Sequence, residues 1–260
     1  MTRLLGAVAV MMVATACGSS AESMGHVHTV AVTDSQILVG THYGLWQVSE
    51  DDDPARVSDL AWDVMGFARG DDAWFASGHP APEQSAPADL GLQVSTDGGR
   101  TWNGRALVGE VDFHRLAFFG DTVAGINSRD GRVFISDDQG VTWRVHDSLP
   151  ANELAVTDEG VLIVGPQQWW VERDGALQGE AMALPEVVTV FADEGSVWAA
   201  TMDGGIWWAP RWQGPWERVT EVPGVASWIG ARDQTIALVV GDQVLISRDK
   251  AATFVPANLQ

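Results

Sequence analysis

Cysteine, tyrosine and basic residues are scarce in this sequence. Its 260 residues include one cysteine, Cys17, and one tyrosine, Tyr43, and 15 lysines and arginines stand against 35 aspartates and glutamates, for a formal net charge of −20. A single cysteine cannot form a disulfide within the chain. The negative charge repels nucleic acid and anionic lipid headgroups, which excludes both as partners and favours cations or neutral ligands.

A hydrophobic run long enough to span a membrane is also lacking near the start of the chain. The apolar segment of residues 4–14 is too short for a membrane-spanning helix. It follows Arg3 and precedes several small residues, which is typical of a secretory signal peptide. We therefore expect residues 1–16 to be a signal peptide that is removed from the mature protein.

The segment Ala14-Thr15-Ala16-Cys17 resembles a bacterial lipobox. In that interpretation Cys17 is acylated and becomes the mature N-terminus, which leaves no thiol for catalysis. The alternative is an ordinary cleaved signal in which Cys17 has no role. The lipobox predicts a lipoprotein anchored to the outer side of the bacterial cell membrane through its acyl chains alone. Residues 17–25 would then form a tether, and residues 26–260 a single domain.

Two octets with one pattern organise the rest of the chain. Residues 95–102 and 136–143 both fit S-x-D-x-G-x-T-W. The pattern suits a tight hairpin turn in which the Ser and Asp side chains bind backbone N–H groups, the Gly is left-handed and the Trp packs into the core. The structural residues are Ser95, Asp97, Gly99, Thr101 and Trp102 in the first octet and Ser136, Asp138, Gly140, Thr142 and Trp143 in the second.

Around the octets the chain divides into six units of roughly forty residues, the period of propellers and arrays. Each unit has three apolar strands, an octet or its remnant, and a fourth strand. First strands are expected near His28, Met65, His114, Glu153, Val188 and Ser227, and remnants at residues 49–56, 172–179, 209–216 and 247–254. Four antiparallel strands per unit predict an all-β, six-bladed β-propeller. A seventh blade would need about forty further residues.

The octets resemble the Asp-box. Together with the segments HVH, THYGL, MGF, SGHP, LGL and DFH, they make the chain resemble BNR/Asp-box β-propellers of the kind found in bacterial secreted, sialidase-like lipoproteins described as glycosyl hydrolases. The resemblance implies that the Asp-box is a structural turn away from the functional face. Sialidases use an arginine triad and a tyrosine paired with glutamate. Here Arg115 and Arg129 form no triad and Tyr43 has no glutamate beside it, so sialidase activity is not expected.

Topology predicts which loops share a face of the propeller. If the first strand of each unit lines the channel, the starts of these strands, the ends of the second strands and the interblade loops lie on one face, and the octets lie on the other. Five of the six histidines fall on the first face, as does Met65, which takes the place of His28 in the second unit. These histidines are His26, His28, His42, His79 and His114.

Imidazoles that converge from adjacent strands are typical of transition-metal sites. We predict a zinc or copper site, and otherwise no cofactor. Its ligands would be His28, His42, His79 and His114, with Met65 or His26 as further ligands and Asp63, Glu110 and Asp112 orienting the imidazoles. The alternative is that each histidine caps a strand end or binds water. The Pro-rich insertion at residues 80–89 follows His79 and could cover the site.

Two other functions stay open. Asp63, Asp112, Glu153 and Asp203 could supply the paired carboxylates of a glycoside hydrolase, one of them with a raised pKa. An assembly scaffold would instead need a broad exposed patch, for which Trp169-Trp170 and Trp207-Trp208 are candidates, although such residues commonly pack between blades. The sequence thus predicts a monomeric binding module for a metal ion, a small ligand or a glycan, in contact with the membrane only through its lipid anchor.

Overall fold

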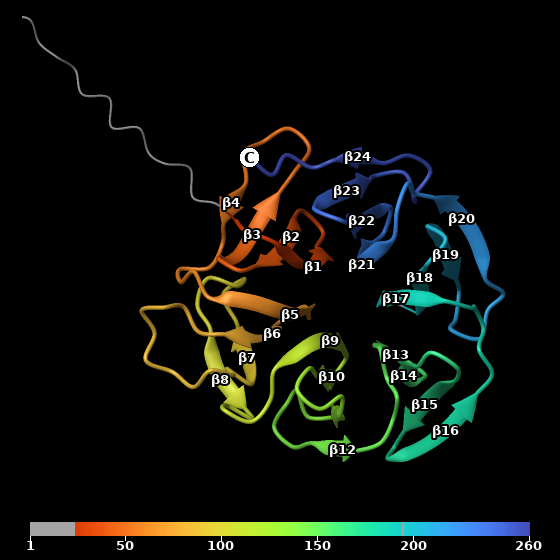
Figure 1. The fold of residues 1–260 in the computed structure, drawn as a ribbon, viewed down its shortest axis with the longest axis horizontal. Helices are drawn as coiled ribbons and strands as arrows, with labels where there is room; N and C mark the ends of the chain where they lie inside the picture. Colours follow the sequence, from red (N-terminus) through yellow and green to blue (C-terminus); the bar gives the residue numbers. More distant parts are fainter. Residues whose placement is uncertain (1–23, 194) are drawn as a thin grey trace, which may run out of the picture.

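The computed structural model describes residues 24–193 and 195–260 and confirms the predicted six-bladed β-propeller. Six four-stranded antiparallel sheets stand in a ring around a central channel (Figure 1). The predicted signal peptide and Cys17 lie outside the described residues. No helix in the described part of the chain is long and apolar enough to cross a membrane.

Each blade consists of four consecutive strands, with the first next to the channel and the fourth at the outside (Figure 1). Blades one and two contain β1 (Val27–Val32), β2 (Ile37–Thr41), β3 (Gly44–Val48), β4 (Ala55–Arg56), β5 (Asp63–Arg69), β6 (Trp74–His79), β7 (Leu92–Ser95) and β8 (Asn103–Ala106). Blades three and four contain β9 (Phe113–Phe119), β10 (Thr122–Asn127), β11 (Val133–Ser136), β12 (Arg144–His146), β13 (Glu153–Thr157), β14 (Gly160–Val164), β15 (Trp169–Arg173) and β16 (Ala176–Glu180). Blades five and six contain β17 (Val187–Asp193), β18 (Ser196–Thr201), β19 (Gly205–Ala209), β20 (Glu217–Glu221), β21 (Ala226–Arg232), β22 (Thr235–Val240), β23 (Gln243–Ser247) and β24 (Val255–Pro256).

The hydrophobic core is divided into six clusters, one between each pair of neighbouring blades. The octet tryptophans are partly buried and pack against these clusters. Trp102 packs edge-on against Trp62 between blades one and two, and Trp143 packs against Phe113 between blades two and three. Partial burial of these large rings against the neighbouring blade adds to the cohesion between blades.

Both octets form the expected turns. In the first, the Ser95 hydroxyl accepts the Gly99 N–H at 2.9 Å, and Asp97 accepts the Thr101 N–H at 3.0 Å and the Thr101 hydroxyl at 2.6 Å. The hydroxyl bond from Thr101 is the main reason that the pKa of Asp97 falls to about 2. Gly99 has a φ of 84°, in the left-handed region where a side chain is unfavourable.

The four expected remnants behave differently. Residues 247–254 keep the full hydrogen-bond set, with Ala251 in the Gly position at a φ of 66°. Residues 49–56 keep the bonds between Ser49 and Asp52. The expectation at residues 172–179 was wrong: Asp174 and Gly175, both at positive φ, make a two-residue hairpin directly between β15 and β16. Residues 209–216 turn through a cis bond before Pro215.

Five of the six first strands carry a β-bulge near their start. The register shifts by one residue after Val27, Val64, Phe113, Val187 and Ala226. The extra residue in blades one, two and three is His28, Met65 and His114, in agreement with the equivalence expected from the repeats. A bulge leaves its extra residue unpaired and turns its side chain out of the regular alternation. The bulge therefore sends the two imidazoles to the channel mouth.

The ring closes without a strand shared between the first and last blades. The backbone N–H of Asn258 donates to the carbonyl of Ser49 at 2.8 Å, and Ala257 and Leu259 pack against the cluster between blades six and one. Arg248 pairs with Glu50 at 2.8 Å across the same boundary. The C-terminal tail thus joins the two ends of the ring.

Candidate metal centre

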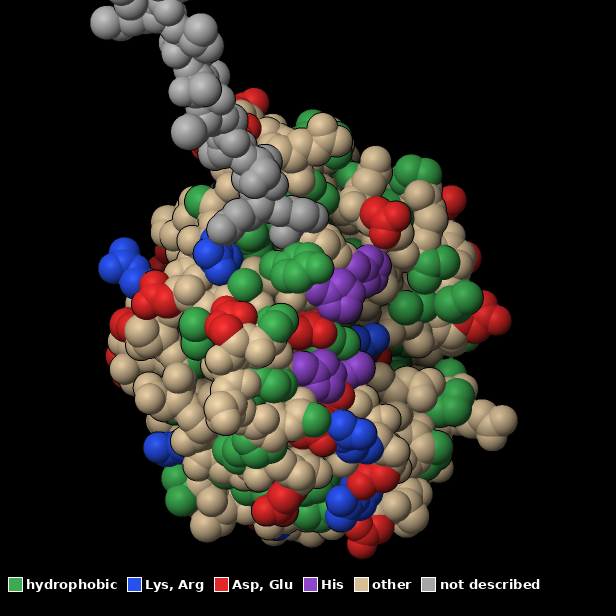
Figure 2. All heavy atoms as spheres, turned by 60° about the vertical axis from the view of Figure 1, so that its left-hand side comes forward, with side chains coloured by type: hydrophobic (Ala, Val, Ile, Leu, Met, Phe, Trp, Pro, Cys, Tyr) green, Lys and Arg blue, Asp and Glu red, His purple; other side chains and the backbone are tan. Residues whose placement is uncertain are grey.

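The histidine face carries two groups of imidazoles and carboxylates. His28, His42 and Asp63 form the first group, and His79, Asp112 and His114 form the second; in each, one donor atom per residue lies within 4.8 Å of the others. Figure 2 shows the histidines of this face gathered in two places, with acidic side chains beside them. Blade two contributes to both groups, because Asp63 begins β5 and His79 ends β6.

The backbone of blade two brings these two contributions together. Asp63 and His79 are direct partners in the register of β5 and β6. Gly78, with a φ of 154°, lies where a Cβ atom would be 1.9 Å from the Asp63 carbonyl oxygen. Only a glycine allows this close approach of the two strands. From this point Asp63 faces blade one and His79 faces blade three.

The first group is a compact triangle of donor atoms. Nδ1 of His42 lies 3.1 Å from Nε2 of His28 and 3.2 Å from Oδ2 of Asp63, and Nε2 of His28 lies 3.3 Å from Oδ1 of Asp63. His28 and Asp63 are mostly buried, whereas His42 is about half exposed, so the group is open on one side. Burial acts to raise the pKa of Asp63, but the adjacent imidazoles of His28 and His42 hold it below its ordinary value.

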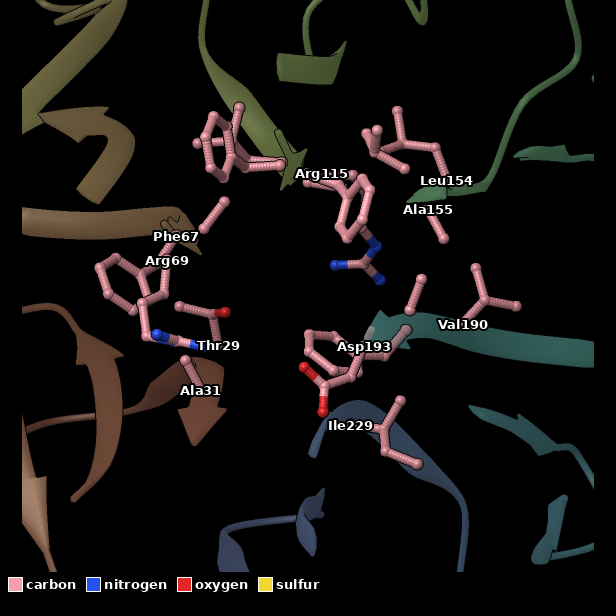
Figure 3. A pocket seen from close by; sticks show the side chains of 18 of the residues that line it. Thr29, Ala31, Phe67, Arg69, Arg115, Leu154, Ala155, Val190, Asp193 and Ile229 are labelled. Carbon is pink, nitrogen blue, oxygen red and sulfur yellow. The ribbon is translucent and has the colours of Figure 1, made fainter. Parts of the chain in front are cut away.

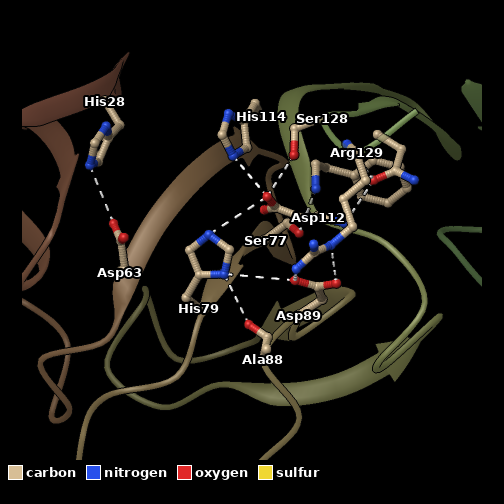
Figure 4. A network of polar contacts seen from close by, with 12 residues as sticks. His28, Asp63, Ser77, His79, Ala88, Asp89, Asp112, His114, Ser128 and Arg129 are labelled. Atoms are coloured by element: carbon tan, nitrogen blue, oxygen red, sulfur yellow. Dashed lines mark hydrogen bonds and ion pairs between the residues drawn. The ribbon is translucent and has the colours of Figure 1, made fainter. Parts of the chain in front are cut away.

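The second group is centred on the Asp112 carboxylate. Its Oδ2 lies 2.8 Å from Nε2 of His114 and 3.6 Å from Nε2 of His79, and the Ser128 hydroxyl donates to it at 2.7 Å (Figure 4). The Asp112 N–H donates to Oδ1 of Asn127, which fixes the loop before β9. Burial acts to raise the pKa of Asp112, but the imidazole of His114 beside it, the hydrogen bond from Ser128 and the nearby His79 keep it below its ordinary value.

The insertion orients His79. Nδ1 of His79 lies 2.9 Å from the carbonyl oxygen of Ala88, and because a carbonyl only accepts, Nδ1 carries the proton. Asp89, the next residue, is held by Arg129 and has an oxygen 3.8 Å from the same Nδ1 (Figure 4). The loop at residues 80–89 is therefore part of the site. In neutral His79, Nε2 is then an acceptor that faces the acceptor oxygen of Asp112.

Three buried atoms in the two groups have no aligned hydrogen-bond partner within residues 24–193 and 195–260. They are Oδ1 of Asp63, Oδ1 of Asp112 and Nε2 of His114. Nε2 of His114 is 2.8 Å from Asp112 without pointing along a hydrogen bond to it. Buried polar atoms are nearly always satisfied, so each of these three atoms requires an explanation.

The remaining residues expected near this site lie around the first group or apart from it. The His26 ring is 5.2 Å from that of His28, and its Nδ1 is 3.5 Å from Asp242 of blade six. Tyr43 is exposed, with its ring 6.5 Å from that of His42. Met65 is the extra residue of the bulge in blade two. Glu110 lies in the loop before Asp112 without contacting a histidine in the described residues.

The other two candidate carboxylates have different surroundings. Glu153 is buried in the channel, where it pairs with Arg115, and burial raises its pKa to about 7 against the influence of that guanidinium. Asp203 is a turn residue: it accepts from the Thr201 hydroxyl at 2.6 Å and from the Gly205 N–H at 3.1 Å, and its pKa is lowered by these bonds. Neither contacts a second carboxylate in the described part of the chain.

The tryptophan pairs provide no broad exposed patch. Trp169 is fully buried between blades four and five, and Trp170 packs between blades three and four. Trp207 and Trp208 pack against the clusters on either side of blade five. Their main role in this structure is packing between blades.

Comparisons with known proteins identify the fold. No protein-family model and no curated protein matches the chain. Among solved structures, YCF48 bound to D1 peptide is 14% identical with a TM-score of 0.50, over 90% of this chain and 81% of that one. A chain of the nidogen/laminin complex is 10% identical with a TM-score of 0.63, over 85% and 91%. The extracellular domain of BT4673 from B. thetaiotaomicron is 12% identical with a TM-score of 0.58, over 91% of this chain and 33% of that one. At these identities the likeness establishes that the chain has a β-propeller fold.

Proposed function

We propose that the protein binds zinc or copper at two sites on the histidine face, each made of two imidazoles and one carboxylate. The observation that carries the proposal is the second group, in which the acceptor Nε2 of His79 and the carboxylate of Asp112 face each other at 3.6 Å. Two acceptors repel unless a cation or proton lies between them. The buried Nε2 of His114, close to the same oxygen without an aligned bond, is oriented as a further donor to such a cation.

The spacing of the first group supports the same function. Ligands about 2.0–2.1 Å from a tetrahedral zinc ion lie about 3.3 Å from one another. The donor separations of 3.1, 3.2 and 3.3 Å among His28, His42 and Asp63 fit one face of such a tetrahedron. The bond from His79 to the Ala88 carbonyl in the second group has the form of the outer contacts that fix metal-bound imidazoles.

Three protein ligands leave a coordination position open toward solvent. Sites with two histidines and one carboxylate hold zinc in hydrolytic enzymes and iron in oxygenases, so this donor set accommodates an exchangeable ligand. We propose an extracytoplasmic binding module of the BNR/Asp-box type that carries metal at the channel mouth. Its anchor would be the acylated Cys17.

Titration of the full chain with zinc and with copper tests the proposal. Isothermal titration calorimetry of metal-stripped protein should give two equivalents per chain for at least one of the two metals. His42→Ala should remove one equivalent and His79→Ala the other, because each residue belongs to a different group. The double variant His42→Ala/His79→Ala should bind neither metal at these sites while keeping its circular dichroism spectrum.

His146→Ala is the matched control, since His146 lies in β12 on the outside of blade three and in neither group. It should retain two equivalents. The proposal is wrong if the wild type takes up neither metal, or if the double variant binds metal as the wild type does.

Glycoside hydrolysis is a second candidate function, favoured by one observation. The pKa of Glu153, raised to about 7 by burial, is that of a general acid at neutral pH. A panel of nitrophenyl glycosides tests it: turnover should fall at least about a hundredfold in Glu153→Gln. Absence of turnover with every glycoside would remove this candidate.

A further inference from the structure

The central channel contains a cavity of about 220 Å³ lined by the first strands of all six blades. Its lining runs from Arg115 and Glu153, near the histidine face, to Arg69 and Asp193 at the ends of their strands on the octet face. Apolar side chains line much of the wall, including Phe67. The cavity is therefore a partly open space whose walls are apolar and polar in about equal measure, with charged groups at both ends.

Arg69 lies in this cavity without a buried counterion. Its side chain is 16% exposed, and its hydrogen-bond partner in the described chain is Asp71, at 3.4 Å, which is 87% exposed. A guanidinium has five N–H donors, so most of those on Arg69 have no acceptor among residues 24–193 and 195–260. Removing a cation from water is costly unless an anion of similar burial accompanies it. The protein provides the desolvated cation and leaves the place of that anion free.

Arg115 adds unused donors to the same cavity. Its Nε–H donates to Glu153, and its guanidinium lies 4.1 Å from the centre of the Trp228 ring, on the opposite side of the channel. The described residues offer no acceptor to its two terminal amino groups. Figure 3 shows the side chains of Arg69 and Arg115 both directed toward the interior of the cavity. Stacking and one hydrogen bond hold Arg115 in place while its remaining donors stay available.

The other charged groups of the cavity are already balanced. Arg232 pairs with Asp34 and, at 3.9 Å, with Asp193. Glu153 is matched by Arg115. Among the described residues of the lining, this leaves Arg69 as the cation whose ion-pair partner, Asp71 at the edge of the cavity, is mostly exposed.

We propose that the channel cavity binds a small organic carboxylate. The carboxylate would pair with Arg69, the body of the molecule would rest on the apolar walls, and Arg115 would donate a further hydrogen bond. Arginine binds carboxylates through two parallel N–H donors, which favours a planar anion over a spherical one. Pockets for drug-sized ligands start near 300 Å³, so this cavity suits a molecule of about ten non-hydrogen atoms or fewer. The proposal does not depend on metal binding.

Benzoate is a suitable probe, because it joins a planar anion to a flat apolar body of the right size. Binding to metal-stripped full-length protein is measured by calorimetry or by ligand-observed NMR. Benzamide has the same shape without the charge and should bind at least about tenfold more weakly, since charge-assisted hydrogen bonds are the stronger class. Inorganic phosphate is tested in parallel to separate organic carboxylates from anions in general.

Two variants localise the binding. Arg69→Gln and Arg115→Gln should each weaken benzoate binding by about tenfold or more. Arg211→Gln is the control, since Arg211 is 70% exposed at the side chain and outside the cavity. Arg69→Gln changes the less embedded of the two ion pairs, so it is the variant expected to fold if Arg115→Gln does not.

The outcomes distinguish this proposal from the metal sites. Benzoate binding should be unchanged in His42→Ala/His79→Ala. If that double variant does not bind benzoate, the anion-binding site lies on the histidine face and the cavity proposal is overturned. The proposal is also overturned if wild type binds no benzoate, if benzamide binds as tightly, or if Arg69→Gln binds like wild type. Phosphate binding that exceeds benzoate binding would contradict an organic carboxylate as the ligand.

Discussion

Replacing Glu153 by Gln should stabilise the protein at neutral and alkaline pH and change little in acid. Burial raises the pKa of Glu153 from 4.5 to about 7. Because the folded state binds this proton more tightly, the stability that it contributes is complete below pH 4.5 and is lost as the pH rises through about 7. A shift of this size corresponds to about 3 kcal/mol in the free energy of unfolding.

Glutamine imitates the protonated carboxyl at every pH. It keeps an acceptor for Arg115 and cannot take a buried negative charge. The difference in unfolding free energy between Glu153→Gln and wild type should therefore be near zero at about pH 4.5 and reach about 3 kcal/mol in favour of the variant near pH 8. All other titrating groups are common to both proteins, so their contributions cancel in this difference.

Urea unfolding followed by tryptophan fluorescence measures the difference at several pH values between these limits. The control is Glu50→Gln, because the hydrogen bond from Arg248 lowers the pKa of Glu50. That variant should be less stable than wild type at neutral pH and should approach it in acid. If the difference between Glu153→Gln and wild type does not change with pH, the desolvation of Glu153 has been misjudged.

Three further changes test the fold. Gly78→Ala should force β5 and β6 apart at Asp63, which would lower the midpoint of thermal unfolding and the metal stoichiometry together; unchanged metal uptake would contradict this. Ser247→Ala removes the acceptor of the Ala251 N–H and should cost about 1 kcal/mol in urea unfolding, whereas a neutral result would mean that the turn is held by other bonds. Deleting residues 257–260 removes the contacts that join blades six and one, and should lower the midpoint of thermal unfolding by about 2–4 °C for each kcal/mol of stability lost. Calorimetry measures this midpoint. An unaltered midpoint would show that the tail adds nothing to the stability of the protein.

The fold was largely predictable because its local signals repeat. The octet residues have chemistry that is meaningful without neighbours: a hydroxyl, a carboxylate and a glycine at fixed spacing define a turn. Residues 172–179 show the limit of this reasoning. Regular spacing suggested an octet there, but Asp174-Gly175 is itself a strong two-residue hairpin signal and determined the local structure.

The candidate site was predictable in its location and less so in its contacts. Repeat equivalence placed His28 and His114 at corresponding positions, and the bulges show why these positions reach the channel mouth. The division into two groups, with Asp63 and Asp112 inside them, depends on side-chain directions that a repeat pattern does not contain. The bond from His79 to Ala88 could be suspected only because the insertion follows His79 directly.

Arg69 was missed altogether for a related reason. At the end of β5 it reads as an ordinary surface residue beside Asp71. Its burial follows from the closure of the ring, which brings the ends of all six first strands around one axis. No local signal in the sequence reports such a long-range effect.

The way the ring closes also sets an order of events during synthesis. All six residues of the two donor groups lie between positions 28 and 114, whereas closure depends on contacts made by residues 257–259. The candidate metal ligands of the first three blades therefore leave the ribosome well before the C-terminal tail that joins blade six to blade one. A chain interrupted after blade three would already carry every donor of both groups, and it would still lack the partner on which blade one closes.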